Sequence, residues 1–342
     1  MQHVVFGAGL IGGYLGGVLA HRSQSVSLVV RDSARERWQQ GLRLSDYQGH
    51  QAGPLHPRLL GSDWRADVKP CDVLWLTVKS TQLAQAAMDA QPLIGPQTKI
   101  FCCQNGVGSE SLVKAIYPHN QVRRVIVPFN VVESAPGCLH RGSEGQLTLE
   151  CLSEKDEIGE LVTLLDCALM PTGSAEDMLA LQWAKLQLNL GNAVNALADV
   201  PVKSMLEEQG YRLILAALMD ELLSVCKARQ LRLPKLTKVP ARWLPFVLRL
   251  PNWLFLRVAS AMLEIDPGVR TSMWWDLKQG KDSEIAYLNG AVIEQALSLG
   301  LDCKVNQVIV TLVHQVEQGK LKLGMSAQQL QECIGLKGGR SH

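Results

Sequence analysis

The first half of the chain alternates short, almost uninterrupted apolar runs with segments of helical period. The apolar runs predict strands at 3–6, 26–30, 73–78 and 100–103, and the segments between and after them predict helices at 10–21, 34–40, 81–90 and 109–116. Strands that are apolar along their whole length are typical of a parallel sheet covered on both faces. This half therefore predicts a βαβ series built on a parallel sheet.

Beyond residue 122 the pattern changes twice. Alternating positions punctuated by Gly and Pro predict further strands within 122–150 that complete the sheet, and 154–167 predicts one more helix. After Gly173 the strand signals stop, and long helical periods are predicted at 175–198, 203–228, 271–279, 283–299 and 306–318. We therefore expect an α/β domain at 1–173, an all-helical domain at 174–330 with a ligand held in a cleft between the two, and a flexible tail at 331–342.

The composition narrows the class of protein. The 342 residues are 47% hydrophobic, enough to bury the cores of two domains. Lys and Arg number 34 against 32 Asp and Glu, so the net charge of +2 gives no sign of a nucleic-acid partner, and any anion site must be local. Nine cysteines without paired spacing indicate reduced thiols and a cytoplasmic protein, and the scattered histidines predict no metal site.

The most apolar stretch, 243–265, is interrupted by prolines and charged residues. It falls well short of the ~18 uninterrupted apolar residues that span a membrane, so we expect no transmembrane segment. It belongs to an insert at about 233–266, in which no acid lies between Glu221 and Glu264. The basic residues of the insert are Lys235, Lys238, Arg242, Arg249 and Arg257. We favour a pair of packed helices or a subunit contact; a lid that shapes the ligand site and a peripheral membrane contact are the alternatives.

The first predicted strand runs directly into a glycine loop. Gly7, Gly9 and Gly12 fit the pattern GxGxxG between a strand and a helix. Gly7 permits a tight turn, Gly9 lets the backbone approach a pyrophosphate, and Gly12 lets the helix pack closely on the strand. The backbone N–H groups at the helix start, at Leu10 and Ile11, would bind the phosphates. This predicts a Rossmann-type dinucleotide-binding domain, with a glycine-rich turn that binds no ligand as the alternative.

The end of the second predicted strand bears on the cofactor. A NAD site usually has Asp or Glu there to bind the ribose hydroxyls, whereas this strand ends in Arg31, whose guanidinium can bind a 2′-phosphate. NADPH or NADP+ is therefore the predicted cofactor. Asp32 follows at once and could pair with Arg31 or itself face the ribose, and Arg31 could be a solvated surface residue.

Two more predicted strands end in polar residues. Lys79 follows the run at 73–78, and Asn105 follows the run at 100–103 after Gln104. Ligands of open α/β sheets bind beyond the carboxyl ends of the strands, so Lys79 and Asn105 are candidates to contact a ligand. Each could instead cap the next helix or form a turn, which is the commoner role of a lone Asn-Gly pair.

One face of the first long helix in the second half is polar. Lys185, Asn189 and Asn192 are spaced i, i+4 and i+7, so they form one stripe on an otherwise apolar helix. A solvent-facing stripe normally carries several charges, but Lys185 and Asp199 are the only charged residues from 179 to 200. A lysine on a mostly buried helix needs a partner or a chemical role.

A second group of polar residues lies between 272 and 290. It includes Ser272 and Asp276, and then Ser283 with Glu284. Helix capping alone would explain the last pair: Ser283 would cap the helix predicted to begin there, and Glu284 would lie in its first turn, where the helix dipole favours an acid.

Together these motifs resemble the ketopantoate reductase (2-dehydropantoate 2-reductase) family of NADPH-dependent two-domain enzymes. The similarity follows the chain in order and spacing through residues 7–13 (GAGLIGG), Val78-Lys79, Gln104-Asn105-Gly106, Trp183 with Lys185-Leu186 and Asn189, Ser272-Met273, Asp276, Ser283-Glu284-Ile285 and Leu288-Asn289-Gly290. The resemblance implies a Rossmann domain followed by a helical domain, with the substrate in the cleft between them.

The resemblance also implies a role for each matched residue. Lys185 would be the catalytic lysine and Glu284 the carboxylate that acts with it. The residues implied to hold substrate are Asn105, Asn189 and Ser272, while Lys79 and Asn105 would lie near the cofactor.

The chain departs from the family at several places. Ala193 stands where the family usually has a second Asn, and Asn192, closer to the azimuth of Lys185, is the expected substitute. Ala286 replaces a usual Asp, Lys304 replaces a common Pro, and the insert at 233–266 does not align. These departures leave the reductase chemistry intact and put the substrate in question.

The leading hypothesis is an NADPH-dependent reductase of a small 2-oxo acid, with ketopantoate as the first candidate and pantoate as its product. A paralogous reductase of a different, bulkier ketone or hydroxy acid is the second hypothesis, and an NADP(H)-sensing protein without catalysis is the third. The expected partner is the small-molecule 2-oxo acid, and a homodimer is left open.

Overall fold

The structure, a computed structural model, describes residues 1–153, 156–259 and 268–336. Its chain divides into two compact units, Met1–Met178 and Leu179–His342. The division falls just beyond the boundary expected after residue 173. Each unit has its own arrangement of elements and is described separately.

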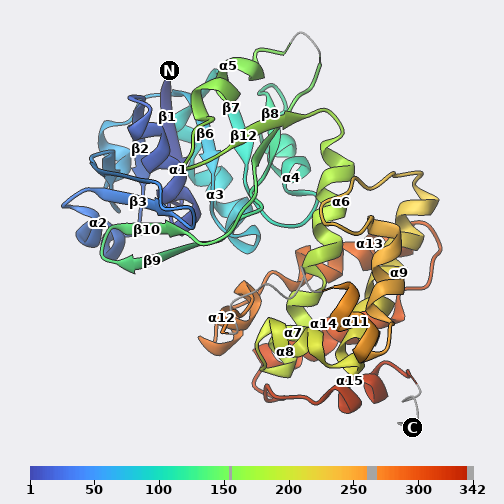
Figure 1. Cartoon of the computed structure of the whole chain (residues 1–342). Helices are drawn as coiled ribbons and strands as arrows, with labels where there is room; N and C mark the ends of the chain where they lie inside the picture. The colour runs from blue at the N-terminus through green and yellow to red at the C-terminus, as the bar shows by residue number, and fades with distance from the viewer. Residues whose placement is uncertain (154–155, 260–267, 337–342) are drawn as a thin grey trace. The chain divides into compact units, whose positions relative to one another are not determined.

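The first unit is built on an eight-stranded sheet, in the order β12-β11-β8-β7-β6-β1-β2-β5 (Figure 1). Its strands are β1 (Gln2–Phe6), β2 (Ser25–Val29), β5 (Arg58–Leu60), β6 (Cys71–Leu76), β7 (Ile94–Cys102), β8 (Val122–Ile126), β11 (Leu147–Glu150) and β12 (Thr172–Ala175). Six neighbouring strands of the sheet pair in parallel, in the order β5, β2, β1, β6, β7 and β8, and β11 is antiparallel to β8. The parallel strands have the order 3-2-1-4-5-6 of dinucleotide-binding sheets, which reverses between β1 and β6.

Helices cover both faces of this sheet. The helices of the unit are α1 (Leu10–His21), α2 (Asp32–Trp38), α3 (Leu83–Asp89), α4 (Ser109–Ile116) and α5 (Ile158–Leu165). Buried side chains of α1 and α5 share one apolar cluster with Val5 and Trp75, and those of α3 and α4 share another with Val4 and Leu74. Successive residues of β1 and β6 thus bury opposite faces, as the uninterrupted apolar runs predict.

A second sheet was not expected from the sequence. It has the order β4-β3-β10-β9, with strands β3 (Leu42–Asp46), β4 (Gln51–Leu55), β9 (Val131–Ala135) and β10 (Cys138–Arg141). The strands predicted within 122–150 therefore do not all complete the main sheet, because β9 and β10 belong to this second one. The reason is the parallel pairing of β10 with β3, which joins segments far apart in the chain and leaves no local sequence signal.

Helix α1 lies between the two sheets. A Cβ atom on Gly16 would come within 2.2 Å of Leu28 in the main sheet, and one on Gly17 would come within 2.8 Å of Leu44 in the second sheet. Its glycines therefore allow close packing on two different sides. Tyr14, fully buried in the same helix, donates a hydrogen bond of 2.9 Å to the carbonyl of Leu169.

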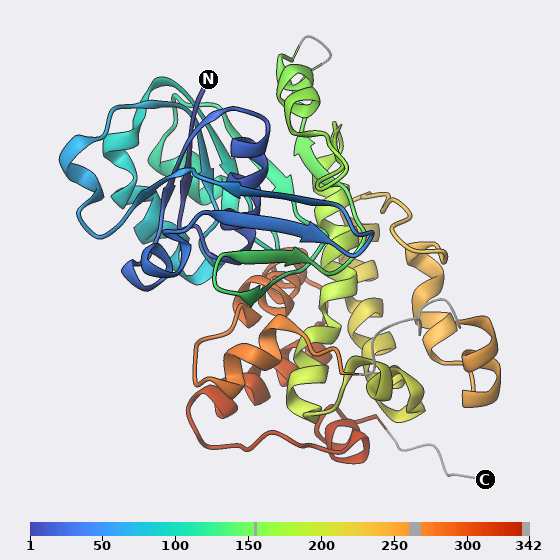
Figure 2. The same cartoon turned by 60° about the vertical axis from the view of Figure 1, so that its left-hand side comes forward.

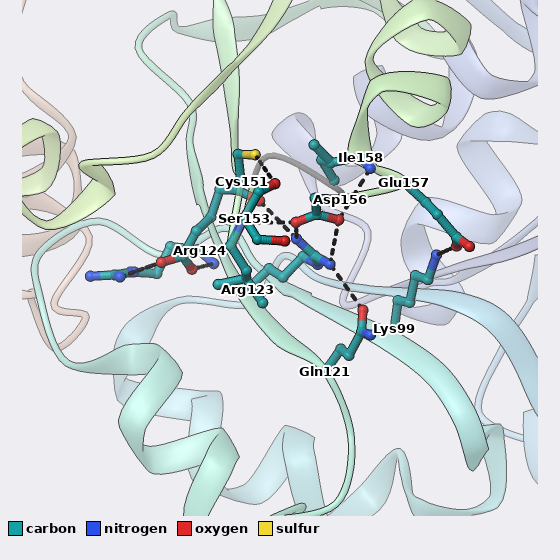
Figure 3. Close-up of polar contacts among 11 residues, drawn as sticks. Lys99, Gln121, Arg123, Arg124, Cys151, Ser153, Asp156, Glu157 and Ile158 are labelled. Atoms are coloured by element: carbon teal, nitrogen blue, oxygen red, sulfur yellow. Dashed lines mark hydrogen bonds and ion pairs between the residues drawn. The ribbon is translucent and has the colours of Figure 1, made fainter.

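A buried ion pair ties β8 to the start of α5 (Figure 3). The Arg123 guanidinium donates to both carboxylate oxygens of Asp156, and the Nη2–Oδ1 distance is 2.8 Å. Only 3% of the Arg123 side chain and 5% of the Asp156 side chain are exposed. Asp156 also accepts from the backbone N–H groups of Leu152 and Ile158. One carboxylate thus links the end of the sheet to the first turn of a helix.

The second unit is helical throughout its described residues. Its α-helices are α6 (Met178–Asn189), whose first residue belongs to the first unit, α7 (Gly191–Ala198), α8 (Val202–Glu207), α9 (Gln209–Ala228), α10 (Leu244–Leu248), α11 (Asn252–Val258), α12 (Ser272–Lys278), α13 (Asn289–Ser298), α14 (Lys304–Glu317) and α15 (Ala327–Cys333). The long helix α9 is central, because α7, α8, α10, α13, α14 and α15 all contact it.

Three predicted boundaries in this unit differ from the structure. The helix expected at 175–198 is divided at Leu190 into α6 and α7, and the helix expected at 203–228 is divided by the extended backbone of Glu208. Helix α15 continues to Cys333, inside the tail expected at 331–342. Residues 337–342 of that tail and 260–266 of the insert lie outside the described residues. No helix in the described part of the chain is long and apolar enough to cross a membrane.

Candidate functional site

The glycine loop follows β1 at the point where the strand order reverses. Gly7 has φ +76°, and a Cβ there would come within 2.1 Å of Val78. A Cβ on Gly12 would come within 2.3 Å of Thr77, whereas a Cβ on Gly9 would meet no atom within 4 Å. The outer two glycines are therefore required by the turn and by packing, and the middle one leaves open space beside the helix start. This is the arrangement that a pyrophosphate needs in order to approach the backbone.

The N-terminus of α1 presents its first backbone N–H groups at this loop. Leu10 is exposed and Ile11 is partly exposed. The first N–H groups of any α-helix lack acceptors within the helix, and the helix dipole favours an anion beside them. The residues present therefore fit a dinucleotide phosphate group.

Three side-chain hydrogen bonds join the ends of the neighbouring strands. Thr77 donates from its hydroxyl to the Gly7 carbonyl (3.2 Å), and Gln104 donates from its amide to the Val78 carbonyl (3.1 Å). Ser80 donates to the Asn105 carbonyl at 3.1 Å. The ends of β1, β6 and β7 are thereby held together. Thr77 and Ser80 were not singled out in the sequence, and Gln104 entered only as part of a family motif, although each lies within two residues of a candidate.

These hydrogen bonds bring Lys79 and Asn105 to the same edge as the glycine loop. Lys79 precedes the 3₁₀ helix η2 (Ser80–Gln82) and is exposed. Asn105 is half-buried and is followed by Gly106, which has φ +88°. The chain bends at Asn105-Gly106, and the bend lies where a ligand of the sheet would bind.

Arg31 and Asp32 follow β2 and have different surroundings. Arg31 is exposed and precedes α2. Oδ1 of Asp32 accepts a hydrogen bond of 3.0 Å from the backbone N–H of Ser62, and this bond lowers the pKa of Asp32. Asp32 is therefore engaged with the loop after β5. That contact makes Asp32 a poorer candidate for the ribose than its position in the sequence suggests. We call Gly7, Gly9, Gly12, Arg31, Lys79 and Asn105 the nucleotide edge.

In the second unit, the predicted polar stripe is present on α6 and α7. Lys185, Asn189 and Asn192 are all half-buried, while Leu186 and Gln187 beside them are fully buried. The interruption at Leu190 retains helical backbone angles, so the i, i+4, i+7 spacing still places the three residues on one face. We call these three residues the Lys185 face.

Ser272 is positioned next to this face through its neighbour Thr271. The Thr271 hydroxyl donates to the Asn192 carbonyl (3.3 Å) and to Oδ1 of Asn195 (3.1 Å), and the Thr271 N–H donates to the same oxygen (3.2 Å). Thr271 also caps α12 by accepting from the N–H of Trp274. The start of α12, including the exposed Ser272, is therefore fixed to α7. Asn195, which is fully buried, was not singled out in the sequence, although it continues the polar stripe three residues after Asn192.

Glu284 lies on a different element, and capping does not explain it. The helix predicted from residue 283 begins only at Asn289 in α13, and Glu284 instead precedes the 3₁₀ helix η6 (Ile285–Tyr287). The hydroxyl and N–H of Ser283 both donate to Glu317 of α14, at 2.7 and 2.9 Å. The same hydroxyl accepts from the Ile285 N–H at 3.3 Å, as a serine that caps the start of η6 does. The predicted cap is therefore present at Ser283 on a 3₁₀ turn, whereas the α-helix predicted to begin there is wrong.

Glu317 makes this anchor a charged one. Burial raises the pKa of Glu317. The hydrogen bonds from Ser283 and His314 lower that pKa by more, so it lies below its usual value. A carboxylate on α14 thus holds the backbone that precedes Glu284.

No group of three His, Cys, Asp or Glu side chains that could hold a metal ion occurs within 1–153, 156–259 and 268–336.

The sheet order, the glycine loop at the reversal and the separate helical unit define a dinucleotide-binding α/β protein with a helical second half. Comparison with family models specifies the class. The model described as ketopantoate reductase PanE/ApbA matches residues 3–154, and the model of the C-terminal part of the same family matches residues 177–317. The chain belongs to the ketopantoate reductase family.

Individual relatives are distant but extend over nearly the whole chain. A 2-dehydropantoate 2-reductase of Mesorhizobium japonicum is 26% identical over 349 aligned positions, covering 93% of this chain and 99% of that protein. The crystal structure of a PanE/ApbA family ketopantoate reductase from Ralstonia eutropha JMP134 is 25% identical with a TM-score of 0.78, covering 94% of this chain and 99% of that one. A ternary structure of D-mandelate dehydrogenase with NADH and anilino(oxo)acetate has the same fold, with a TM-score of 0.77, 19% identity and the same coverage.

Family membership makes the protein an oxidoreductase of a family that uses NAD(P)H. The predicted fold class and the predicted enzyme class are confirmed. The hypothesis of a sensor without catalysis has no support from these relatives. The particular 2-oxo acid and the choice between NADPH and NADH are proposals.

Proposed function

We propose that the protein reduces a 2-oxo acid to the 2-hydroxy acid with NADPH, and that ketopantoate, giving pantoate, is the first candidate substrate. The observation that carries the proposal is the Lys185 face: a lysine with two amides in line, half-buried on helices that are otherwise apolar. The cytoplasm is the compartment we propose, since all nine cysteines lie in the described residues as free thiols.

The chemistry follows from the residues. Bound NADPH would supply the hydride at the nucleotide edge. Reduction of a ketone builds negative charge on its oxygen, and the Lys185 ammonium would stabilise that charge and donate the proton. Glu284 would act with Lys185. Asn105, Asn189, Asn192 and Ser272 would orient the substrate carboxylate and hydroxyl, because amides and hydroxyls form hydrogen bonds without adding charge.

The preference for NADPH rests on Arg31. Its exposed guanidinium at the end of β2 is suited to a 2′-phosphate, and the contact of Asp32 with Ser62 makes Asp32 a poorer candidate to bind the ribose. We expect Arg31→Ala to weaken NADPH binding roughly 10- to 100-fold while NADH binding changes little, since a charged hydrogen bond is lost only with NADPH. Fluorescence titration of both cofactors measures this. Arg58→Ala, an exposed arginine in β5, is the control. Equal losses for both cofactors would assign Arg31 a structural role.

An aromatic 2-oxo acid is the second candidate substrate. Trp275 is 54% exposed and lies one helical turn after Ser272 on α12, so a residue proposed to hold substrate has an open indole beside it. The structural neighbour crystallised with NADH and anilino(oxo)acetate acts on mandelate according to its name. An exposed indole beside Ser272 favours a larger, flat substituent than that of ketopantoate.

The decisive experiment follows NADPH absorbance with ketopantoate, aromatic 2-oxo acids and other 2-oxo acids in one assay. We expect turnover of at least one of them, and in Lys185→Ala a kcat about 10²- to 10⁴-fold lower with NADPH affinity retained. Lys227→Ala, an exposed lysine on α9, is the matched control. NADPH binding without oxidation by any 2-oxo acid would contradict the proposed reaction, and full activity of Lys185→Ala would contradict the proposed proton donor.

A further inference from the structure

The described part of the insert packs against α9. It consists of the 3₁₀ helix η4 (Ala241–Trp243) with α10 and α11, which we call the aromatic platform. Its inner side chains, including Leu244, Leu248 and Phe255, are buried, and α10 packs on α9. Figure 2 shows this gold-to-orange segment at the right-hand edge of the view.

A buried arginine of α9 anchors the platform. Arg212 is fully buried and donates to the carbonyls of Leu248 (3.1 Å) and Leu250 (2.8 Å) and to the side-chain oxygen of Asn252 (2.9 Å). Its guanidinium carbon lies 4.1 Å from the ring centroid of Phe255. The Arg212 guanidinium therefore holds both the end of α10 and the start of α11.

A second anchor connects the platform to α6. Gln187, fully buried, donates from its amide to the carbonyl of Ala241 at 2.9 Å. With anchors on two helices, the platform presents its outer face on a fixed support.

That outer face is aromatic. Trp243, Phe246 and Trp253 are 49%, 59% and 72% exposed, and Leu256 and Val258 are also exposed. The rings of Trp243 and Phe246 meet edge to face with centroids 6.1 Å apart. Trp243 and Phe246 therefore form one exposed apolar patch, and Trp253 is exposed on the next helix. Exposed apolar patches mark a binding surface more often than single exposed side chains do. These side chains belong to η4, α10 and α11 of the second unit, whereas the residues of the nucleotide edge belong to the first unit.

The charge of the segment indicates what this surface binds. From Leu222 to Ala259 the sequence has eight Lys and Arg and no Asp or Glu. Asp220 of α9 pairs with Arg249, which leaves the other seven in excess. The Arg242 guanidinium lies 5.8 Å from the ring centroid of Trp243, so charge and aromatic surface are presented together. Indole rings beside basic groups match the interface of a bilayer that contains anionic lipids.

A second copy of this chain is a poorer occupant. A two-fold contact through the platform would place the same basic surface against itself, so that Arg242 and Arg257 would face like charges. Anionic lipid has the opposite charge and accepts the aromatic rings at its headgroup level. The short helices and exposed prolines suit a surface contact and not a spanning segment.

We propose that the aromatic platform binds the surface of bilayers containing anionic phospholipid. Trp243, Phe246 and Trp253 enter the headgroup region, and Arg242 and Arg257 contact lipid phosphates. This second binding surface shares no residue with the nucleotide edge or the Lys185 face, and it would hold the enzyme at a membrane surface.

The test is co-sedimentation of the full chain with vesicles of phosphatidylcholine alone and of phosphatidylcholine with phosphatidylglycerol. We expect binding to the anionic vesicles, loss of that binding in high salt, and little binding to phosphatidylcholine alone. Arg242→Gln with Arg257→Gln should lower the partition coefficient roughly 30-fold. Trp243→Ser with Trp253→Ser should also abolish sedimentation. The controls are Lys320→Gln with Lys322→Gln for charge and Trp275→Ser for an exposed indole elsewhere.

Circular dichroism and thermal unfolding show whether each variant is folded, and the two double variants remove different chemistry from one surface. No sedimentation of the wild type with anionic vesicles overturns the proposal. An equal loss of vesicle binding in the platform variants and the control variants also overturns the proposal. A concentration-dependent dimer by analytical ultracentrifugation that Trp253→Ser dissociates, with no vesicle binding, would assign the surface to self-association instead.

Discussion

At the residue scale, Gly9 and Gly12 have different reasons to lack a side chain. Gly12 is packed against Thr77, and Gly9 faces open space. One glycine of the motif is therefore needed for packing and the other for a ligand. Replacing each of them by Ala separates the two requirements.

We expect Gly9→Ala to leave the unfolding temperature without cofactor unchanged and to raise the Kd for NADPH tenfold or more, because its methyl group would occupy the approach of the pyrophosphate. Gly12→Ala should cost about 1–3 kcal/mol of stability through overpacking, lowering the unfolding temperature by roughly 2–10 °C. Calorimetry and NADPH titration measure the two effects. Wild-type affinity in Gly9→Ala would show that the loop does not approach the phosphates.

The sequence alone could predict the elements and spacings on which the candidate site rests, because each depends on a local pattern. The bounds of α1 and α4 match their predicted ranges, and the stripe of Lys185, Asn189 and Asn192 follows from helical spacing. Asn195 and Thr271 were missed because their importance arises from contact between α7 and α12, which no spacing reveals. The α-helix predicted from Ser283 begins only at Asn289, after a 3₁₀ turn at 285–287, and the contact of Ser283 with the distant Glu317 has no local sequence signal.

At the element scale, the contact between α7 and α12 positions Ser272. We expect Asn195→Leu to cost about 1–3 kcal/mol, since the Val200 carbonyl and the Thr271 donors would lose their buried partner. The shift of α12 should raise KM for the 2-oxo acid roughly tenfold or more, with NADPH affinity unchanged. Thr271→Ser, which retains the hydroxyl, should behave as the wild type. A purely structural role would lower stability without changing KM.

The link between β8 and α5 gives the protein a defined response to acid. Burial raises the pKa of Asp156, but its hydrogen bonds to Arg123 and to backbone N–H groups outweigh this and leave the pKa below its usual value of 3.8. Because the folded pKa is lowered, the contribution to stability is fully present above pH 3.8 and is lost as the pH falls through the folded pKa.

Asp156→Asn should therefore cost about 3–5 kcal/mol at neutral pH, because Arg123 stays buried without its carboxylate. The difference from the wild type should stay constant from pH 8 to about 5 and shrink below about 4. Urea unfolding across this range is the measurement. Asp63→Asn, which breaks an exposed pair with Arg35 at 3.4 Å, should cost less than about 1 kcal/mol. A difference that persists unchanged at low pH would contradict the ion-pair explanation.

At the scale of the whole molecule, the two units have separate cores, and the nucleotide edge belongs to only one of them. NADPH at a hundred times its Kd should stabilise the folded enzyme by about 2.7 kcal/mol through binding linkage. Hydrogen exchange should slow most in β1, α1 and β6 and remain unchanged in α15. Uniform protection of both units, or none in β1 and α1, would contradict this assignment of the cofactor.

The second sheet could not be foreseen from local patterns. Because of it, the position of α1 depends on packing against β3 as well as on the main sheet. Leu44 carries no candidate chemistry, yet it packs on a different side of α1 from the main sheet. Damage to this remote support would loosen the helix start that receives the phosphates. Variants that weaken cofactor affinity should therefore be found among residues of β3 and β10 that never touch the nucleotide, and a screen restricted to the glycine motif would overlook them.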